Sequence, residues 1–365
     1  MGNPEVSVVV ATYKGANTLR YVLEGLSQQT FRDFEVVAVV KPSADQTLEL
    51  LRKYADQLEI EVVTQKNGNV VDAEQLGLER AKGRIIVFFD DDAVPRPDCI
   101  EEHVKTYADQ RIGGVAGDLI PSTIADGVVK ELEEVEVPPS QSARTRLSAR
   151  VWDHPVEGLE QYRCCVTRCG FIWHGFLLAD NPVGNLVYWR KRGMVKSFLG
   201  PGANMSVLAS AGKGTVFEKT DYWRRGYAWE QFLAWQVWKK GYSMVLNTKA
   251  RVEHILLDGH LTGGLYATSV KNAAPGELEK TDSVEKARAI GYDHIREEHL
   301  LFFRLYRRGS GLSLFAKFCS VANDALYFFK TVRSLQESKN LRVLFVSNLI
   351  GLRWLLSDAH GARLS

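Results

Sequence analysis

Three consecutive carboxylates, Asp90, Asp91 and Asp92, follow the apolar run IIVFF at residues 85–89. Such a run is typical of a strand that is buried on both faces of a parallel sheet and that releases the next side chains into a crevice at the sheet edge. Adjacent carboxylates repel one another, and a cation between them removes that repulsion. Because their ligand atoms are oxygens, Mg²⁺ or Mn²⁺ is favoured. For the triplet alone, the alternative is a solvated acidic turn.

A second group of ligand-type residues, around the cysteines, fits metal binding less well. Cys164, Cys165, Cys169 and His174 have the spacing CC-x3-C-x4-H, which lacks the C-x2-C pair of structural zinc sites. The five cysteines also form no paired framework of the secreted kind. We therefore interpret them as buried thiols, or as a disulfide if the source is a hyperthermophile.

The elements before the aspartates alternate between strand and helix. Valine-rich runs predict strands at 6–11, 35–40 and 60–64, and apolar periodicity predicts helices between them. The helical markers are Leu19, Val22, Leu23 and Leu26, then Leu48, Leu51 and Tyr54, then residues 73–81; Asn17 or Thr18 is expected near the N-cap of the first helix. This alternation predicts a doubly wound, Rossmann-like α/β fold with a mostly parallel central sheet flanked by helices. Residues 12–13, 41–45, 67–69 and 90–92 all follow strand ends, so one crevice would collect them.

The second half of the chain is less regular. We expect a helix at 97–108, a strand at 113–119 and an acidic excursion or mobile loop at 122–150. A glycine-rich turn at 200–205 precedes an aromatic-rich helix at 223–240, and two short strands follow at 243–246 and 250–254. The glycine-rich turn lacks the lysine–serine pair of a nucleotide-hydrolase phosphate loop.

Charge is distributed unevenly along the 365 residues. The net charge is +2, but residues 300–365 hold ten Lys/Arg against three Asp/Glu, a charge of +7, which leaves −5 for residues 1–299. A basic tail suggests an anionic partner such as a membrane surface or a nucleic acid, and a solvated basic face is the alternative. No signal peptide is visible, which favours the cytoplasm. Charged residues interrupt the apolar runs at 312–329 and 343–356, so neither is expected to span a membrane.

Several segments, in order, resemble the family-2 glycosyltransferases, which have the GT-A fold. The opening VSVVVATYKGANTL resembles the first strand and turn of that family, and LSQQTFRDFEVVAVV resembles its entry to the second strand. NGNVVDAEQLGLERAKGRIIVFFDDDAVPRPD resembles the run that ends in its DxD motif, and GANM, WEQFLAWQVWKKGY and ARVEH resemble its acceptor-side half. The resemblance implies a GT-A catalytic domain at 1–265, with a nucleotide-binding half at about 1–120 and an acceptor-side half at 121–265. Residues 266–365 would form a basic, helical C-terminal extension.

The same resemblance implies roles for individual residues. Asp92 and Asp90 would hold Mn²⁺ or Mg²⁺ beside the donor diphosphate, with His254 as a further ligand, and Asp91 would lie beside the donor. Glu230 stands where the family has its catalytic carboxylate, although Trp-Glu replaces the usual Glu-Asp pair, and it would act as the base in an inverting transfer. Further donor-binding candidates are Thr12, Tyr13, Lys41, Asp45 and Gln75. The alternative for His254 is a surface or core histidine without a metal. The alternative for Glu230 is a glutamate that only complements the dipole at a helix N-terminus.

The implied partners are a nucleotide-sugar donor, UDP- or GDP-linked, and a glycan or lipid-linked acceptor; no nucleic acid partner is expected. Lys41 replaces an acidic residue that often accepts from the base, and lysine can only donate, so uridine loses support as the nucleoside. A peripheral contact with the cytoplasmic face of a membrane is expected through 300–365, as in relatives that act on lipid-linked acceptors. A small helical core is the alternative for that region.

The sequence is also compatible with two functions other than that of a hexosyltransferase. IIVFFDDDAV also fits the first motif of haloacid-dehalogenase-like phosphatases, in which Asp90 would be the nucleophile and Asp92 the general acid. Three strand–helix units precede the motif here, whereas that family has it at or near the first strand. The third function is a non-catalytic protein that binds a nucleotide sugar, which the irregular Trp229-Glu230 suggests.

Overall fold

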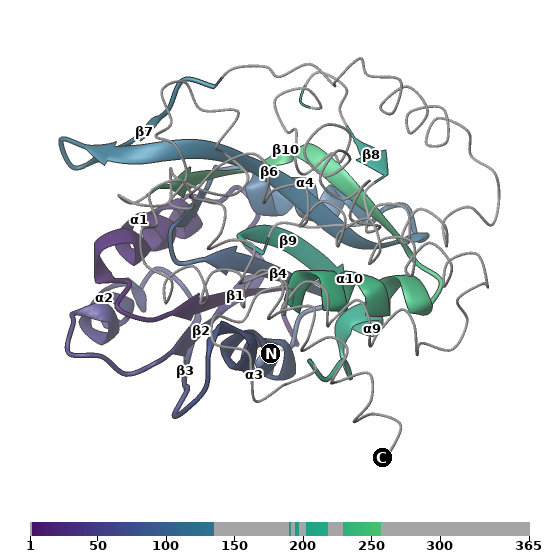
Figure 1. Cartoon of the computed structure of the whole chain (residues 1–365), viewed down its shortest axis with the longest axis horizontal. Helices are drawn as coiled ribbons and strands as arrows, with labels where there is room; N and C mark the ends of the chain where they lie inside the picture. The colour runs from purple at the N-terminus through teal and green to yellow at the C-terminus, as the bar shows by residue number, and fades with distance from the viewer. Residues whose placement is uncertain (1, 135–189, 191–193, 197–201, 218–228, 257–365) are drawn as a thin grey trace, which may run out of the picture. The chain divides into compact units, whose positions relative to one another are not determined.

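The computed structural model describes residues 2–134, 190, 194–196, 202–217 and 229–256. These residues form a mixed ten-stranded sheet with the strand order β3-β2-β1-β4-β9-β6-β10-β5, to which β7 and β8 add by pairing with β6 and β10. Helices flank this sheet (Figure 1). The arrangement is an α/β fold with a central sheet flanked by helices, as the sequence predicts.

The first half of the chain alternates strictly between strand and helix. The elements are β1 (Val6–Thr12), α1 (Ala16–Ser27), β2 (Phe34–Val40), α2 (Thr47–Tyr54), β3 (Ile60–Thr64), α3 (Val70–Arg80) and β4 (Ile85–Asp90). Strands β1 to β4 are all parallel neighbours, and every residue of β2 is buried. The valine-rich composition accounts for this, because strands covered on both faces need apolar side chains on both.

The strand order changes direction between β1 and β4. The chain builds outward from β1 to β2 and β3, then returns to place β4 on the other side of β1, where Ala11 pairs with Asp90. A crevice opens at such a switch point because the connections leave the two strand ends in opposite directions. The aspartates therefore emerge where an open α/β sheet binds its ligands.

The second half of the chain extends the sheet with antiparallel and parallel strands. Its elements are β5 (Ala93–Pro95), α4 (Cys99–Thr106), β6 (Ile112–Ala125), β7 (Val128–Glu131), β8 (Val195–Lys196), β9 (Asn204–Leu208), α9 (Ala209–Gly212), α10 (Trp229–Lys239) and β10 (Ser243–Ile255). Strand β9 lies antiparallel between β4 and β6, and β10 is parallel to β6 and antiparallel to β5. The two halves thus share one continuous sheet.

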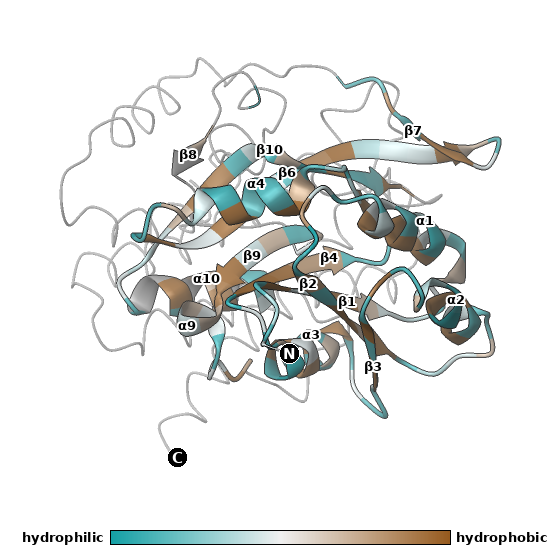
Figure 2. Cartoon of the chain, turned by 180° about the vertical axis from the view of Figure 1, so that it is seen from behind, coloured by the Kyte–Doolittle hydropathy of each residue, from teal (hydrophilic) through white to brown (hydrophobic). Residues whose placement is uncertain are grey.

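The hydrophobic core lies along the central strands, as the brown colouring of β1 and β4 in Figure 2 shows. Phe88 and Phe89 are among the largest fully buried side chains, and Trp229 packs on Phe88 with ring centroids 5.0 Å apart. A buried aromatic pair of this kind stabilises the contact beyond the burial of area alone. The end of β4 and the start of α10 are thereby held together.

Buried polar groups join β6 and β9 in the same region. Asp118, which is fully buried, accepts two hydrogen bonds from the guanidinium of Arg190, at 2.6 and 3.0 Å. The side-chain amide of Asn204 donates to the backbone oxygens of Asp118 and Ala250, and its oxygen lies 2.9 Å from Nε2 of His103. Burial lowers the pKa of His103 to about 4, so its imidazole is neutral in this network.

Asn17 and Thr18 lie in the first turn of α1, near its N-cap as predicted; the N-cap itself is Gly15, which has no side-chain cap, and the hydroxyl of Thr18 donates to the oxygen of Gly15. Another local prediction, in contrast, is wrong. The predicted loop at 122–150 begins instead as a hairpin, because β6 continues to Ala125 and β7 returns along it. Asp126 and Gly127 both have positive φ angles of 57° and 76°, which suit a two-residue hairpin turn.

The end of the described chain also differs from the prediction. The two strands expected at 243–246 and 250–254 are a single strand, β10, with register shifts at Ser243/Met244 and between Asn247 and Arg251. The side-chain oxygen of Asn247 accepts from the backbone of Lys249, which fits a bulge at that point. Part of the glycine-rich turn at 200–205 is also strand, since β9 begins at Asn204.

Several predictions fall on residues outside the described ranges. These are the cysteines at 164, 165 and 169, the start of the helix expected at 223, and the C-terminal extension at 266–365. The domain boundaries therefore stay predictions, as do the membrane contacts of 300–365. Among the residues that the structure describes, no helix is long and apolar enough to cross a membrane.

Candidate active site

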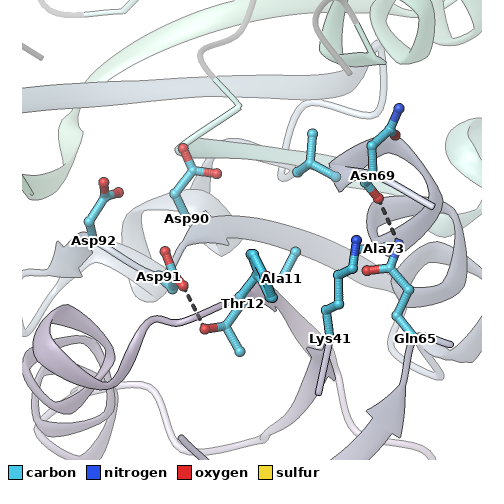
Figure 3. A pocket seen from close by; sticks show the side chains of 11 residues that line it. Ala11, Thr12, Lys41, Gln65, Asn69, Ala73, Asp90, Asp91 and Asp92 are labelled. Atoms are coloured by element: carbon cyan, nitrogen blue, oxygen red, sulfur yellow. Dashed lines mark hydrogen bonds between the residues drawn. The ribbon is translucent and has the colours of Figure 1, made fainter. Parts of the chain in front are cut away.

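The ends of β1, β2, β3 and β4 surround one cavity of about 370 Å³ (Figure 3). Eleven residues line it: Ala11, Thr12, Tyr13, Lys41, Gln65, Asn69, Val70, Ala73, Asp90, Asp91 and Asp92. The expectation that one crevice collects residues 12–13, 41–45, 67–69 and 90–92 is confirmed for the first and last of these ranges, for Lys41 and for Asn69; residues 42–45, 67 and 68 do not line the cavity. A cavity of this volume accommodates a ligand of small-molecule size.

At one side of the cavity, Asp90, Asp92 and His254 each offer one ligand atom, and these atoms lie within 4.8 Å of one another. The backbone produces this cluster, because His254 pairs with Ala93 between β10 and β5 and the backbone N–H of Ile255 donates to the oxygen of Asp92. Oδ1 of Asp92 is buried and has no hydrogen-bond partner of good geometry among the described residues; Nε2 of His254 lies 3.2 Å away as an ionic contact. Two carboxylates and an imidazole fit Mn²⁺ or Mg²⁺, and an orphaned buried oxygen is what a cation would satisfy.

The electrostatics of the cluster also favour a bound cation. Burial, followed by the charge of Asp92, raises the pKa of Asp90 to about 7. Burial alone lowers the pKa of His254, but the neighbouring Asp92 and Asp90 outweigh it and raise that pKa. In the metal-free protein, protons on Asp90 and His254 therefore offset charge that a divalent cation would otherwise neutralise.

Asp91 has a different environment from its two neighbours. The hydroxyl of Thr12 donates to Oδ2 of Asp91 at 2.5 Å, and the backbone N–H of Tyr13 also bonds to this carboxylate. Burial raises the pKa of Asp91 to about 6 despite these bonds. A side chain on Gly15 would collide with the same carboxylate, since a Cβ there would lie 2.2 Å from Oδ2. Asp91 thus lines the cavity and also fixes the turn after β1.

Tyr13 and Lys41 form the opposite wall of the cavity. The ring of Tyr13 is 52% exposed, and the ammonium groups of Lys14 and Lys41 each lie 5.3 Å from its centroid. Nζ of Lys41 donates to the backbone oxygen of Gly68 at 2.8 Å. An exposed aromatic face and a cation at the mouth of a cavity suit a nucleobase and an anionic or carbonyl oxygen.

Gln65 and Asn69 also line the cavity; the sequence predicts a place there for residues 67–69 but not for Gln65. The amide of Gln65 donates to the backbone oxygen of Asn69 at 2.7 Å, as the dashed line in Figure 3 shows. Asn69 also caps α3 by accepting from the N–H of Val71, so its backbone position is fixed by the helix start. A signal for Gln65 was present in the sequence, since it directly follows the third strand.

Two of the expected donor-binding residues are not among those that line the cavity. Asp45 accepts from Ser43, Thr47 and the backbone N–H of Ala16, and so ties the loop after β2 to the start of α1. The amide of Gln75 donates to the backbone of Thr215 and accepts from that of Phe217. Both side chains stabilise the framework of the site in the structure described here.

Glu230 lies in the first turn of α10, directly after the buried Trp229. Because Trp229 packs on Phe88 of β4, the start of α10 is held near the end of that strand. The charge of Glu230 contributes to the raised pKa of Asp90, so the two carboxylates are within electrostatic range. The structure therefore brings Glu230 into the neighbourhood of the metal-compatible cluster.

Comparison with known proteins agrees with this geometry. Residues 7–174 match the model of glycosyl transferase family 2, a segment that contains β1 to β4 and the three aspartates. This segment of the chain is thus similar to glycosyltransferase family 2. The aspartates consequently lie inside this glycosyltransferase-like segment and not at the start of a phosphatase fold.

Curated relatives resemble only part of this chain. It is 30% identical over 121 residues to glycosyltransferase AglE of Haloferax volcanii, which is 32% of this chain and 40% of the relative. It is also 30% identical over 89 residues to the cholesterol galactosyltransferase of Borreliella burgdorferi, which is 24% of this chain and 25% of the relative. The matched segments thus span less than half of these relatives.

Solved structures with a similar fold are more distant in sequence. TarS 1-349 of S. aureus covers 98% of this chain and 92% of its own, with 13% identity and a TM-score of 0.46. Mannosyltransferase PcManGT of Pyrobaculum calidifontis, in complex with GDP-Man and Mn²⁺, covers 97% and 88%, with 15% identity and a TM-score of 0.48. Likeness at this level carries no information about the ligands of this chain.

Proposed function

We propose that this chain is a metal-dependent glycosyltransferase that moves a sugar from a nucleotide-sugar donor to an acceptor hydroxyl, with inversion at the anomeric carbon. The observation that carries the proposal is the cluster of Asp90, Asp92 and His254 at the edge of a cavity, in a chain whose residues 7–174 match the family-2 model. Mn²⁺ or Mg²⁺ held by these three residues would neutralise the charge that develops on the diphosphate as the glycosidic bond breaks.

The other residues supply binding and proton transfer. Tyr13 and Lys41 contact the nucleotide at the mouth of the cavity, and the donor is UDP- or GDP-linked. Glu230 accepts the proton of the acceptor hydroxyl as its oxygen bonds to the anomeric carbon and the bond to the diphosphate breaks. A single displacement of this kind inverts the configuration at that carbon. One base near the metal site is sufficient for it.

The acceptor and the location of the enzyme are part of the same proposal. A glycan or lipid-linked acceptor fits a family-2-like enzyme whose residues 300–365 carry a charge of +7. A basic segment of this kind is attracted to an anionic membrane surface. We place the enzyme at the cytoplasmic face of a membrane, in peripheral contact through this region.

The test uses the full chain with UDP-glucose, UDP-N-acetylglucosamine, GDP-mannose and a dTDP-sugar, with and without Mn²⁺. The wild-type protein should show a Mn²⁺-dependent rise in Tm with one of these donors, because a ligand that binds only the folded state stabilises it. It should also release the nucleoside diphosphate slowly, by transfer or by hydrolysis.

Glu230→Gln then separates binding from chemistry. The variant should keep the donor-dependent rise in Tm and lose at least ~100-fold in turnover, since general base catalysis contributes about 10²–10⁴-fold. Glu49→Gln on the exposed face of α2 serves as the control. Unchanged turnover in Glu230→Gln would remove Glu230 as the base, whereas donor binding without turnover in the wild type would point to a non-catalytic binding protein. Phosphate release from simple phosphoesters would revive the phosphatase alternative.

A further inference from the structure

Glu74 is a buried carboxyl group to which the proposed mechanism gives no role. It lies on α3, directly after the cavity-lining Ala73, and is only 1% exposed. Its Oε2 is buried and has no hydrogen-bond partner within the part of the chain that the structure describes. A buried acceptor of this kind is rare in folded proteins and destabilises them unless something else satisfies it.

The charged groups around Glu74 are all acidic. Burial foremost, and then the carboxylates of Asp90, Glu230 and Asp91, raise the pKa of Glu74 well above its ordinary value. Within the described ranges, no cation is among the groups that act on it. Glu74 also lies outside the described group of metal-compatible residues, which contains Asp90, Asp92 and His254. Neither an ion pair nor the metal site therefore accounts for this side chain.

The position of Glu74 is defined by its neighbours along the helix and across the site. Gln75 is bonded to the backbone of Thr215 and Phe217, which fixes this face of α3 against the segment before α10. Asp90 ends β4, and Glu230 begins α10. Glu74 is thus within electrostatic range of both the metal-compatible cluster and the candidate base.

We propose that the carboxyl of Glu74 binds hydroxyl groups of the sugar that is transferred. The inference rests on the proposed function. The proposed reaction determines where the sugar must lie relative to the other groups. The anomeric carbon must lie between the diphosphate, which is held beside Asp90 and Asp92, and the acceptor oxygen, which is held beside Glu230. The part of the donor that lies near both groups is the sugar, which is neutral and rich in hydroxyls. Its hydroxyl hydrogens can donate to an acceptor oxygen that the described residues leave unpaired.

The test compares Glu74→Met, which removes the polar atoms at similar volume, with Glu74→Gln, which keeps hydrogen bonding without charge. Glu49→Met on exposed α2 is the matched control. The donor is whichever of UDP-glucose, UDP-N-acetylglucosamine or GDP-mannose the wild-type enzyme turns over, and the corresponding nucleoside diphosphate is the sugar-free probe. Affinities for both ligands are measured by calorimetry with Mn²⁺, together with kcat, KM and Tm.

For Glu74→Met we expect an unchanged affinity for the nucleoside diphosphate and a kcat/KM for the donor that is ~10- to 100-fold lower. Tm in the absence of ligand should rise by about 2–4 °C, because the unsatisfied buried carboxyl is gone. Glu74→Gln should lose less kcat/KM than Glu74→Met, and Glu49→Met should behave like the wild type.

Each other outcome overturns the inference. Wild-type kcat/KM in Glu74→Met would show that the sugar does not use this carboxyl, and a lower Tm would show a structural role. Equal losses of affinity for the nucleotide and for the sugar nucleotide would make Glu74 part of the metal or nucleotide site. If the wild-type enzyme binds none of the donors with Mn²⁺, the proposed function itself fails, and that result is distinct from the first three.

Discussion

Replacing Asp90 by Asn should stabilise the metal-free protein, and it should do so only at neutral and higher pH. The folded protein raises the pKa of Asp90 from 3.8 to about 7, so the contribution of this group to stability is present in full below pH 3.8 and is lost as the pH rises through about 7. An asparagine has no proton to lose and avoids that penalty. The stability difference between Asp90→Asn and the wild type should therefore grow from pH 5 to pH 8.

The magnitude follows from the geometry of the cluster. The ligand atoms of Asp90, Asp92 and His254 lie within 4.8 Å of one another. Two negative charges at that separation repel by about 3.5 kcal/mol at an effective dielectric constant of ~20. The rise in the pKa of Asp90 corresponds to about 4 kcal/mol. Solvent screens both carboxylates in part, and this reduces the expected gain in unfolding free energy to about 1–3 kcal/mol, or roughly 2–10 °C in Tm.

The assay is thermal unfolding of both proteins with a chelator at pH 5 and pH 8, and then with Mn²⁺ at pH 8. The wild-type protein should gain stability with Mn²⁺, and Asp90→Asn should gain much less, since it lacks one ligand. Asp126→Asn makes the same chemical change at a 90% exposed side chain in a hairpin turn whose positive φ asparagine tolerates. A Tm difference that is equal at pH 5 and pH 8, or an undiminished response of Asp90→Asn to Mn²⁺, would refute the reasoning.

Two further predictions concern nucleotide binding and the framework of the site. Lys41→Met should raise the Kd for UDP or GDP about 10-fold in calorimetry, because a charge-assisted hydrogen bond at the mouth of the cavity is lost; an unchanged Kd would remove Lys41 from the nucleotide site. Arg190→Met should lower the unfolding free energy by about 3–5 kcal/mol, because it leaves the fully buried Asp118 without its closest cation. Arg251, at 3.8 Å from Oδ2 of Asp118, is then the remaining arginine in contact with this carboxylate. Chemical denaturation measures the loss, and a change below ~1 kcal/mol would mean that Arg251 compensates for Arg190.

The parallel half of the fold and its binding edge could be predicted from local patterns. Continuous apolar runs, rich in valine in β1 and β2, mark β1, β2 and β4 as doubly covered strands, and parallel strands leave their carboxyl ends on one edge. Thr12, Lys41 and Asp90 meet around one cavity for that reason. The predicted strand at 60–64 matches β3 to the residue, although its side chains are only partly buried.

The antiparallel half could not be predicted in the same way, because pairing between distant segments decides it. Strand β9 follows a glycine-rich segment and becomes a strand by bonding to β4 on one side and β6 on the other. Strand β10 continues through a bulge between Asn247 and Arg251. In the sequence these residues resemble a break between two shorter strands. The Asp126-Gly127 turn did carry a local signal, and the acidic, apolar-poor residues after it obscured that signal.

The same distinction, between local sequence pattern and contacts made in the folded protein, applies to the site residues. A polar residue after a strand end is a good candidate for the cavity, yet the side chain decides whether it reaches the ligand or bonds to the framework. Asp45 and Gln75 bond to backbone groups and to neighbouring side chains, while Gln65 and Asn69 line the cavity. Glu74 could not be chosen from the sequence, because nothing distinguishes it from the other residues of its helix. Its burial and an oxygen without a partner among the described residues identify it only in the structure.

The carboxylates gathered at the carboxyl ends of the strands destabilise the metal-free protein and at the same time provide the ligands for binding. Burial foremost, and then neighbouring carboxylates, raise the pKa values of Asp90, Asp91 and Glu74. Lys41 lies at the mouth of the cavity, bonded to Gly68, and does not appear among the groups that act on these carboxyls. A metal-free protein must therefore hold protons on its acids or bear their repulsion. A divalent cation and a hydroxyl-rich sugar would each relieve a different part of this cost, the cation at Asp90 and Asp92 and the sugar at Glu74. Substitutions that remove one of these carboxylates should therefore stabilise the fold and weaken ligand binding. Asp90→Asn should weaken binding of the cation, and Glu74→Met should weaken binding of the sugar.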